Sequence, residues 1–168
     1  MMYYITGGER SGKSRYAQEL ALQLCSKPKY VATSRIWDND HKARIDRHIA
    51  ERGERWLSVT EEKVLSKVIH EGETVVIDCV TLWLTNFFSD TKNDVEKTLE
   101  QAKKEFKKLL DINATTIIIS NEIGMGVHAE TAVGRKFTEV QGWMNQYIAN
   151  YAEKAILMVS GIPVTIKK

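Results

Sequence analysis

Cysteine is scarce in this chain, because only Cys25 and Cys79 occur among its 168 residues. Two cysteines cannot form a disulfide framework, and neither stands in a C-x-x-C or histidine-rich spacing of the kind that binds metals. Long hydrophobic runs are missing as well, since no stretch approaches the ~18 apolar residues of a membrane helix. The N-terminus turns glycine-rich too early for a signal peptide. We therefore expect a cytoplasmic protein without membrane insertion.

The chain also has no marked excess of either charge. Its 24 Lys and Arg stand against 22 Asp and Glu, and the formal net charge is +2. So small an excess gives no argument for a nucleic-acid partner, and we expect none. A hydrophobic content of 43% is enough for a full core and argues against disorder. With no repeat, linker or low-complexity segment, residues 1–168 are expected to form a single domain, in which a local cluster of groups must hold any anionic ligand.

Short β-branched runs alternate with longer segments of helical period. The runs are mostly continuous, which suits strands buried on both faces of a parallel sheet. Repeated strand–helix–strand units predict an open α/β sheet with right-handed crossovers, and the turn at 160–163 predicts a C-terminal antiparallel hairpin. The expected strands are residues 2–6, 30–33, 74–79, 115–120, 155–160 and 164–167. The expected helices are residues 13–24, 40–52, 61–70, 95–110 and 131–152.

A phosphate-binding loop is the clearest motif. Residues 7–14 match G-x-x-x-x-G-K-[ST] in full, between an expected strand and an expected helix, so the fold is predicted to be P-loop NTPase-like. In such a loop the backbone N–H groups and the helix N-terminus face phosphate oxygens. Lys13 would reach the β- and γ-phosphates, and the Ser14 hydroxyl would ligate Mg²⁺. The alternative is a chance glycine turn. The predicted nucleotide-binding residues of the loop are Gly7, Gly8, Glu9, Arg10, Ser11, Gly12, Lys13 and Ser14.

A second metal-binding position is expected at Asp78. This residue ends the apolar run Val75-Val76-Ile77, as in the Walker B strand of P-loop enzymes, although an aspartate can also simply end a strand.

The segment Thr91-Lys92-Asn93-Asp94 formally fits a guanine-reading motif. It follows a polar stretch rather than a buried strand, and no Asp-x-x-Gly switch segment occurs. We interpret it as a solvated loop that caps the next helix, which disfavours a signalling GTPase but leaves GTP itself possible as a substrate.

A mostly basic stripe is predicted on the helix that follows the second strand. Arg44, His48, Glu51, Arg52 and Arg55 fall at i, i+4, i+7, i+8 and i+11 of that helix. A stripe of this kind is often only a solvated face. One strand away from a phosphate loop, however, it is a candidate anion-binding surface.

Taken together, these motifs resemble the bifunctional adenosylcobinamide kinase / adenosylcobinamide-phosphate guanylyltransferases of cobalamin biosynthesis. The resemblance covers nearly the whole chain. Arg10 inside the phosphate loop and the Asn-Glu-x-Gly-x-Gly run are its most specific features. The matching segments are Gly7-Gly-x-Arg-Ser-Gly-Lys-Ser14, Tyr30-Val-Ala-Thr-Ser34, Arg44-Ile-x-x-His48 with Arg52 and Trp56, Asp78-Cys-Val-Thr-Leu-Trp-Leu-Thr-Asn86, Ser120-Asn-Glu-Ile-Gly-Met-Gly126 and Val159-Ser-Gly161.

The resemblance implies two reactions and homotrimeric assembly. Adenosylcobinamide would be phosphorylated by a nucleoside triphosphate such as ATP or GTP, and GMP from GTP would then be transferred to adenosylcobinamide phosphate through a guanylylated histidine. His48 matches the nucleophile, a role that suits an imidazole with a neutral ring nitrogen at neutral pH. We hypothesise that Arg44 and Arg52 disfavour the imidazolium and bind the charge of the transition state.

Further nucleotide contacts are predicted at the end of the second strand and after Trp56. Ala32, Thr33 and Ser34 lie beside the phosphate loop, where strand-end capping is the alternative. The family often has a glutamate where this chain has Thr60, so Glu61 is a candidate reader of guanine. It can equally supply a negative charge at the start of the helix expected there.

Asn121 and Glu122 follow a buried strand at the carboxyl edge of the sheet, where open α/β sheets bind ligands. We expect both on the substrate side, near the transferring phosphate, and a tight structural turn is the alternative. Two other functions remain open: a P-loop kinase with a single activity, using Lys13, Ser14 and Asp78, and a GTP-binding module that turns nothing over.

Overall fold

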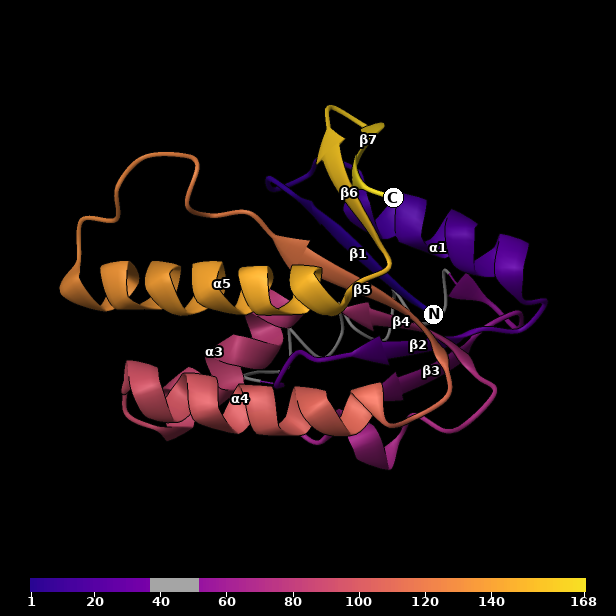
Figure 1. The fold of residues 1–168 in the computed structure, drawn as a ribbon, viewed down its shortest axis with the longest axis horizontal. Helices are drawn as coiled ribbons and strands as arrows, with labels where there is room; N and C mark the ends of the chain where they lie inside the picture. Colours follow the sequence, from indigo (N-terminus) through magenta and orange to yellow (C-terminus); the bar gives the residue numbers. More distant parts are fainter. Residues whose placement is uncertain (37–51) are drawn as a thin grey trace.

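One mixed sheet organises the described part of the chain, residues 1–36 and 52–168 of a computed structural model. The strand order is β3-β2-β4-β5-β1-β6-β7, and all neighbours are parallel except β6 and β7 (Figure 1). The strands are β1 Met2–Gly7, β2 Lys29–Ala32, β3 Leu57–Thr60, β4 Thr74–Asp78, β5 Thr115–Asn121, β6 Lys154–Val159 and β7 Ile162–Lys167. The helices are α1 Lys13–Leu24, the 3₁₀ turn η1 Leu65–Lys67, α3 Val80–Asp90, α4 Val95–Leu110 and α5 Ala132–Tyr151.

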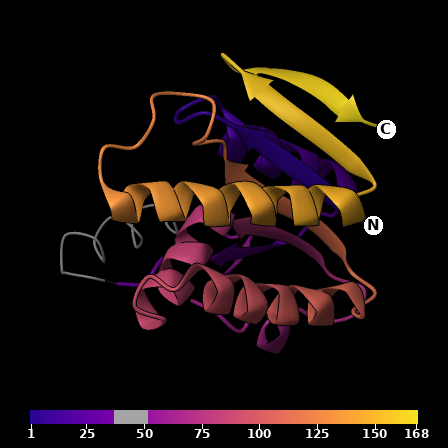
Figure 2. The ribbon, with the colours of Figure 1, turned by 60° about the vertical axis from the view of Figure 1, so that its left-hand side comes forward.

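Helices cover the two faces of the sheet unequally. Helix α1 packs on one face through Ala17 and Ala21, which are fully buried against Ile5, Val76 and other strand residues. Helices α3, α4 and α5 pack on the other face, where α4 and α5 lie side by side (Figures 1 and 2). Both faces are therefore apolar, which explains why the central strands are continuous hydrophobic runs rather than alternating ones. No helix of the described residues has the length and apolar character needed to cross a bilayer.

The predicted α/β class and the C-terminal hairpin are confirmed. The helices expected at 13–24 and 95–110 have those bounds, and α5 begins one residue late because Thr131 is its N-cap and accepts the N–H of Gly134. Asp94 caps α4 by accepting the N–H of Lys97, so the reading of residues 91–94 as a capping loop is confirmed as well. The helix expected at 40–52 lies almost entirely outside the described residues.

The sequence did not predict two of the observed elements, and one predicted helix does not form. Helix α3 was not expected, although Val80, Trp83, Leu84 and Phe87 follow helical spacing and are buried in the core. The short edge strand β3 was also missed. The helix expected at 61–70 is wrong, since only the 3₁₀ turn η1 forms there.

An ion pair between a buried lysine and a partly exposed glutamate joins the beginnings of β2 and β4. Lys29 is 8% exposed, and its ammonium donates to the Val68 carbonyl at 2.7 Å and to both carboxylate oxygens of Glu73 at 2.5 and 2.6 Å. Burial alone would raise the pKa of Glu73, but the bonds from Lys29 and from the His70 N–H outweigh it and lower that pKa. The Glu73 carboxylate therefore balances the positive charge of Lys29, which the sheet buries.

Replacing Glu73 with glutamine is expected to lower the free energy of unfolding by ~3 kcal/mol, because a buried ammonium would lose its counter-ion. Urea denaturation measures this value. Glu71→Gln, at an exposed position two residues away, is the matched control and should change stability by only a few tenths of a kcal/mol. Equal stability of the two variants would contradict the importance given to the pair.

Candidate active site

The phosphate loop connects the end of β1 to the start of α1. Gly7 pairs with Asn121 on one side and with Met158 on the other. Its φ is +153°, and a Cβ there would lie 2.6 Å from the Met158 carbonyl oxygen, so only glycine fits. The Gly161 N–H donates to the Ser11 carbonyl at 3.0 Å, which places the β6–β7 turn directly behind the loop. The loop is thus held by the sheet on one side and by this turn on another.

The pocket over the loop has a volume of about 250 Å³ and is lined by residues 10–15. The Lys13 side chain is 6% exposed, and its ammonium donates to the Gly8 carbonyl at 2.6 Å. Burial lowers the pKa of Lys13, and nearby acidic groups only partly offset this effect. A cation, backbone N–H groups and a helix N-terminus therefore share one small pocket, an arrangement suited to phosphate oxygens.

The predicted metal ligands, Ser14 and Asp78, meet at the edge of this pocket. The Ser14 hydroxyl donates to Asp78 Oδ2 at 2.9 Å, and the Tyr30 hydroxyl donates to the same oxygen. Within the described residues, no three His, Cys, Asp or Glu side chains cluster in a way that would hold a metal by themselves. Mg²⁺ is usually bound by one or two protein oxygens together with substrate phosphates, so this donor set fits it. Because the Ser14 hydroxyl donates its hydrogen bond to Asp78, the lone pairs of its oxygen remain available to a metal.

The end of β2 lies against the end of β4, with Ala32 opposite Asp78. Thr33 is fully buried, and its hydroxyl donates to the Cys79 carbonyl at 2.7 Å and accepts the Cys79 N–H at 2.8 Å. Ser34 is 7% exposed. The hydroxyl of Thr33 is therefore engaged with backbone, as strand-end capping requires, while the strand end itself borders the metal position.

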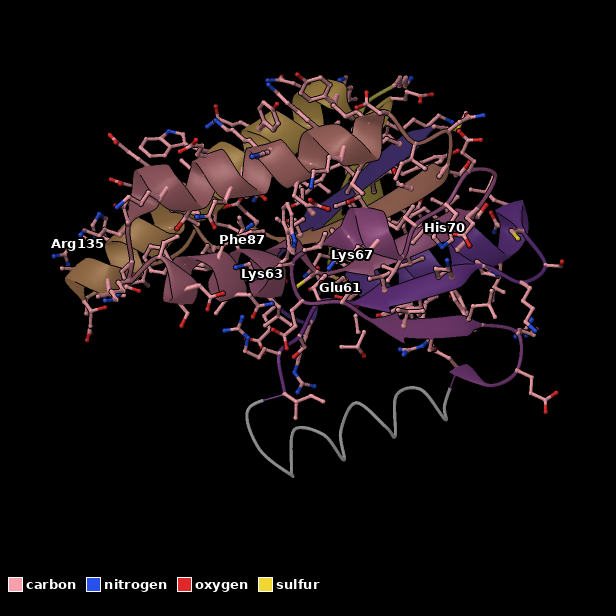
Figure 3. The ribbon with its side chains drawn as sticks, turned by 90° about the horizontal axis from the view of Figure 1, so that it is seen from below. Glu61, Lys63, Lys67, His70, Phe87 and Arg135 are labelled. Atoms are coloured by element: carbon pink, nitrogen blue, oxygen red, sulfur yellow. The ribbon has the colours of Figure 1, made fainter. Side chains whose placement is uncertain are left out.

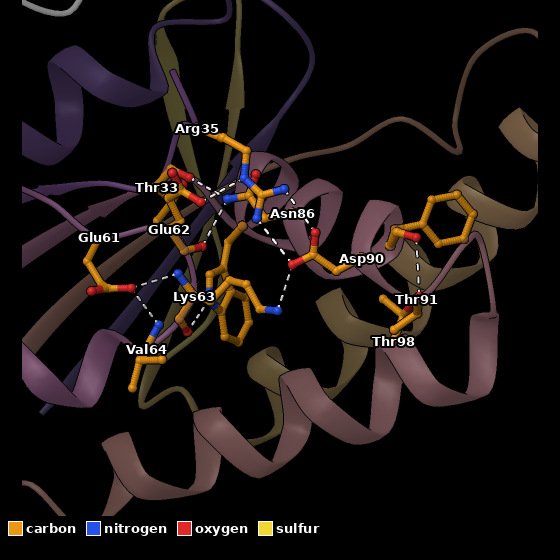
Figure 4. Close-up of polar contacts among 12 residues, drawn as sticks. Thr33, Arg35, Glu61, Glu62, Lys63, Val64, Asn86, Asp90, Thr91 and Thr98 are labelled. Atoms are coloured by element: carbon orange, nitrogen blue, oxygen red, sulfur yellow. Dashed lines mark hydrogen bonds and ion pairs between the residues drawn. The ribbon is translucent and has the colours of Figure 1, made fainter. Parts of the chain in front are cut away.

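Glu61 follows β3 and lies close to a network of charged side chains (Figures 3 and 4). One of its carboxylate oxygens accepts the N–H groups of Lys63 and Val64, at 2.9 and 2.8 Å. Part of the carboxylate is thus used to fix a turn, which resembles the capping alternative even though no helix begins there.

Next to Glu61, Arg35 joins two carboxylates. It donates to Glu62 at 2.7 Å and to Asp90 at 2.9 and 3.2 Å, while Lys63 donates to Asp90 at 2.8 Å. These bonds from Arg35 and Lys63 hold the pKa of Asp90 well below its usual range. Asn86 on α3 bridges the carbonyls of Thr33 and Glu62 (Figure 4). The strand end at Thr33 is therefore tied to α3 as well as to β4.

Asn121, the last residue of β5, and Glu122, which follows it, lie next to the phosphate loop. The Glu122 N–H donates to the Gly7 carbonyl at 2.9 Å, and its carboxylate accepts the Gly124 N–H at 2.7 Å. Beyond them lies a pocket of about 210 Å³, lined by nine residues that fall between positions 123 and 139. The loop beside it exposes Met125 and Val127, at 79% and 95%.

The basic stripe is only partly visible, because Arg44 and His48 lie outside the described residues. Arg52 is described, and its guanidinium carbon lies 3.8 Å from the centroid of the Tyr30 ring. Its Nε donates to the Ser58 hydroxyl at 3.3 Å. Tyr30 lies in the segment Tyr30-Val-Ala-Thr-Ser34, and its contact with Asp78 was not predicted from the sequence. Its place two residues before the strand end that borders Asp78 was the signal that could have drawn attention to it.

This loop, placed between the first strand and the first helix and paired with a strand-end aspartate that binds its serine, defines a P-loop nucleotide-binding protein. Within that class the chain belongs to the CobU family, described as cobinamide kinase / cobinamide phosphate guanyltransferase, whose model matches residues 3–166. The resemblance inferred from the motifs is thereby confirmed, and the chain is an enzyme of this family.

Similar proteins support the assignment. The bifunctional adenosylcobalamin biosynthesis protein CobU of Escherichia coli (strain K12) is 37% identical, and the match covers 99% of this chain and 100% of that protein. CobP of Pseudomonas aeruginosa, which carries the same bifunctional description, is 32% identical over 97% of this chain and 95% of its own length. CobU of Salmonella typhimurium is 33% identical over 99% and 100%.

Proposed function

We propose that this chain phosphorylates adenosylcobinamide with a nucleoside triphosphate and then transfers GMP from GTP to adenosylcobinamide phosphate. The products of the second step are adenosylcobinamide-GDP and pyrophosphate. The observation that carries the proposal is the contact between Ser14 and Asp78 at the mouth of an intact phosphate loop, in a chain matched by the kinase/guanyltransferase model along nearly its whole length.

In the kinase step the loop holds the triphosphate of ATP or GTP. Backbone N–H groups of residues 7–14 and the ammonium of Lys13 would bind the phosphate oxygens, and Ser14 and Asp78 would hold Mg²⁺. When bound, Mg²⁺ would supply positive charge that offsets the negative charge of the phosphates. The hydroxyl of the acceptor then attacks the γ-phosphorus in line, and the nucleoside diphosphate leaves.

In the transferase step we assign the nucleophile to His48, with Arg44 and Arg52 as cationic neighbours. A neutral imidazole nitrogen attacks the α-phosphorus of GTP, and the bond from that phosphorus to the pyrophosphate oxygen breaks. A phosphate oxygen of adenosylcobinamide phosphate next attacks the same phosphorus and releases the histidine. Two transfers replace one direct displacement, as in other covalent mechanisms. Ala32, Thr33, Ser34 and Glu61 are proposed to border the nucleotide.

The acceptor is proposed to approach from the carboxyl edge of β5. Asn121 and Glu122 lie there, one hydrogen bond away from Gly7, so a group bound beside them is adjacent to the transferring phosphate. Ligands of open α/β sheets characteristically bind at this edge.

We also propose that the chain works as a homo-oligomer, a trimer by resemblance to its family. Strand β7 supports association, because it is an edge strand with Ile162, Val164 and Ile166 exposed at 65%, 44% and 57%. Exposed apolar edges of this kind commonly mark contacts between proteins.

The test is a pair of assays run separately on the purified chain. With adenosylcobinamide and γ-labelled ATP or GTP, label should appear in the corrinoid. With adenosylcobinamide phosphate and GTP, pyrophosphate should be released. Transfer from the γ-position without pyrophosphate release would favour a kinase with a single activity, and the absence of both would favour a GTP-binding module.

A further inference from the structure

Asp78 accepts hydrogen bonds from two hydroxyl groups on a single oxygen. Ser14 from α1 and Tyr30 from β2 both donate to Oδ2. Among residues 1–36 and 52–168, no hydrogen bond reaches the other oxygen, Oδ1. A carboxylate rotates easily about its last torsion, because that torsion has broad minima. Two donors that converge on one oxygen remove this freedom and determine which oxygen faces the phosphate pocket.

Tyr30 is itself held in place from several sides. Its side chain is buried, with the residue 5% exposed, and Trp56 contacts its ring edge-on at a centroid distance of 5.8 Å. The Arg52 guanidinium covers one ring face at 3.8 Å, and its Nε is bonded to Ser58, the residue opposite Tyr30 in β3. A guanidinium over an aromatic face is attractive, more so where both are shielded from water. The hydroxyl of Tyr30 therefore meets Asp78 from a fixed position.

We propose that Tyr30 is a positioning residue of the metal site, which orients the Asp78 carboxylate for Mg²⁺ and is itself held by Arg52. This inference rests on the proposed function, in which Ser14 and Asp78 hold the metal. Groups that hydrogen-bond to metal ligands commonly change metal affinity 10–100-fold when they are removed. The single O–H group of Tyr30 donates its hydrogen bond to Asp78 and not to the phosphate loop. Removing this hydroxyl should therefore weaken metal binding and leave metal-free nucleotide binding unchanged.

Tyr30→Phe tests this directly, because it removes the hydroxyl and keeps the ring under Arg52. Mn²⁺ is titrated into the complex of the full chain with ATP and followed by electron paramagnetic resonance. We expect the dissociation constant of Mn²⁺ to rise about 10-fold. The affinity for ATP in EDTA, measured by calorimetry, should stay within twofold. An unchanged Mn²⁺ constant, or an equal loss of ATP affinity in EDTA, would overturn the proposal.

Tyr3→Phe is the matched control, since Tyr3 lies in the same core cluster and has no bond to Asp78. It should leave the Mn²⁺ constant unchanged. Asp78→Asn separates this inference from the proposed function. If Asp78→Asn weakens Mn²⁺ binding and Tyr30→Phe does not, only the role of Tyr30 is wrong. If Asp78→Asn has no effect, the assignment of the metal site itself is wrong.

Arg52→Met tests whether Arg52 holds Tyr30 in place. Alone, it should raise the Mn²⁺ constant by less than Tyr30→Phe does. Combined with Tyr30→Phe it should add nothing, because Arg52 acts on the metal site only through the tyrosine hydroxyl. Additive effects of the two substitutions would show that Arg52 does not act through Tyr30.

Discussion

Replacing Lys13 with alanine is expected to abolish both transfers, lowering kcat/KM for each by at least about 10²-fold. In the proposed mechanism both reactions start from a triphosphate in the same loop, and the Lys13 ammonium is the buried cation of its pocket. Its loss removes a charge that binds the phosphates and stabilises the transition state. The two assays described above measure the rates, and calorimetry with ATP and GTP measures binding.

Lys13→Arg should be nearly as inactive, although it keeps the charge. The pocket holds a slim ammonium 2.6 Å from the Gly8 carbonyl, and a planar guanidinium does not fit that position. Lys27→Ala, an exposed lysine just beyond α1, is the control and should leave both rates unchanged. Undiminished affinity of Lys13→Ala for both nucleotides would contradict the assignment of the loop.

Local signals explain which elements the sequence predicted well. Helix α4 has its cap in Asp94 and α5 has its cap in Thr131, and both have long apolar stripes, so their bounds could be read almost to the residue. Helix α3 has no side-chain cap at Cys79, and its Val-Thr-Leu-Trp-Leu start is as apolar as a buried strand. Periodicity was present there but was hidden because apolar residues dominate the start of the helix.

The helix predicted at 61–70 does not form because of contacts with residues distant in the sequence. Leu65 and Ile69 are both buried and are spaced as in a helix, yet the backbone there is tied to side chains from elsewhere. Glu105 of α4 accepts the N–H of Ser66 at 2.9 Å. This N–H group has a partner outside the segment, so a helix is not needed to satisfy it.

The residues of the site likewise fall into those that local sequence could predict and those that it could not. The phosphate loop is contiguous, so its residue types and spacing were enough to predict it. The meeting of Tyr30 with Asp78 depends on the pairing register of β2 and β4, which sets Ala32 opposite Asp78, and residues 48 positions apart give no local sign of it. The same applies to the pairing of Lys29 with Glu73. Such contacts follow from topology, and topology becomes known only when the whole sheet is assembled.

Replacing His48 with alanine is expected to separate the two activities. Guanylyl transfer should fall by at least about 10³-fold, because removal of a covalent nucleophile leaves only binding and electrostatic stabilisation. Kinase activity should stay within a few-fold, since in the proposed kinase step the acceptor hydroxyl attacks the γ-phosphorus directly at the Lys13–Ser14–Asp78 site. Incubation with α-labelled GTP should label the unaltered chain with a phosphoramidate, which is acid-labile and alkali-stable, and should leave His48→Ala unlabelled.

His70→Ala is the matched control, since His70 is an exposed histidine that follows η1 (Figure 3). It should label and turn over like the unaltered chain. Label retained by His48→Ala would place the nucleophile elsewhere, and parallel loss of kinase activity would mean that His48 supports the triphosphate site as a whole. Retained kinase activity with lost labelling is the one result that neither a single-activity kinase nor a GTP-binding module produces. It would show that one phosphate loop serves two attacks, on the γ-phosphorus by the acceptor and on the α-phosphorus by the histidine.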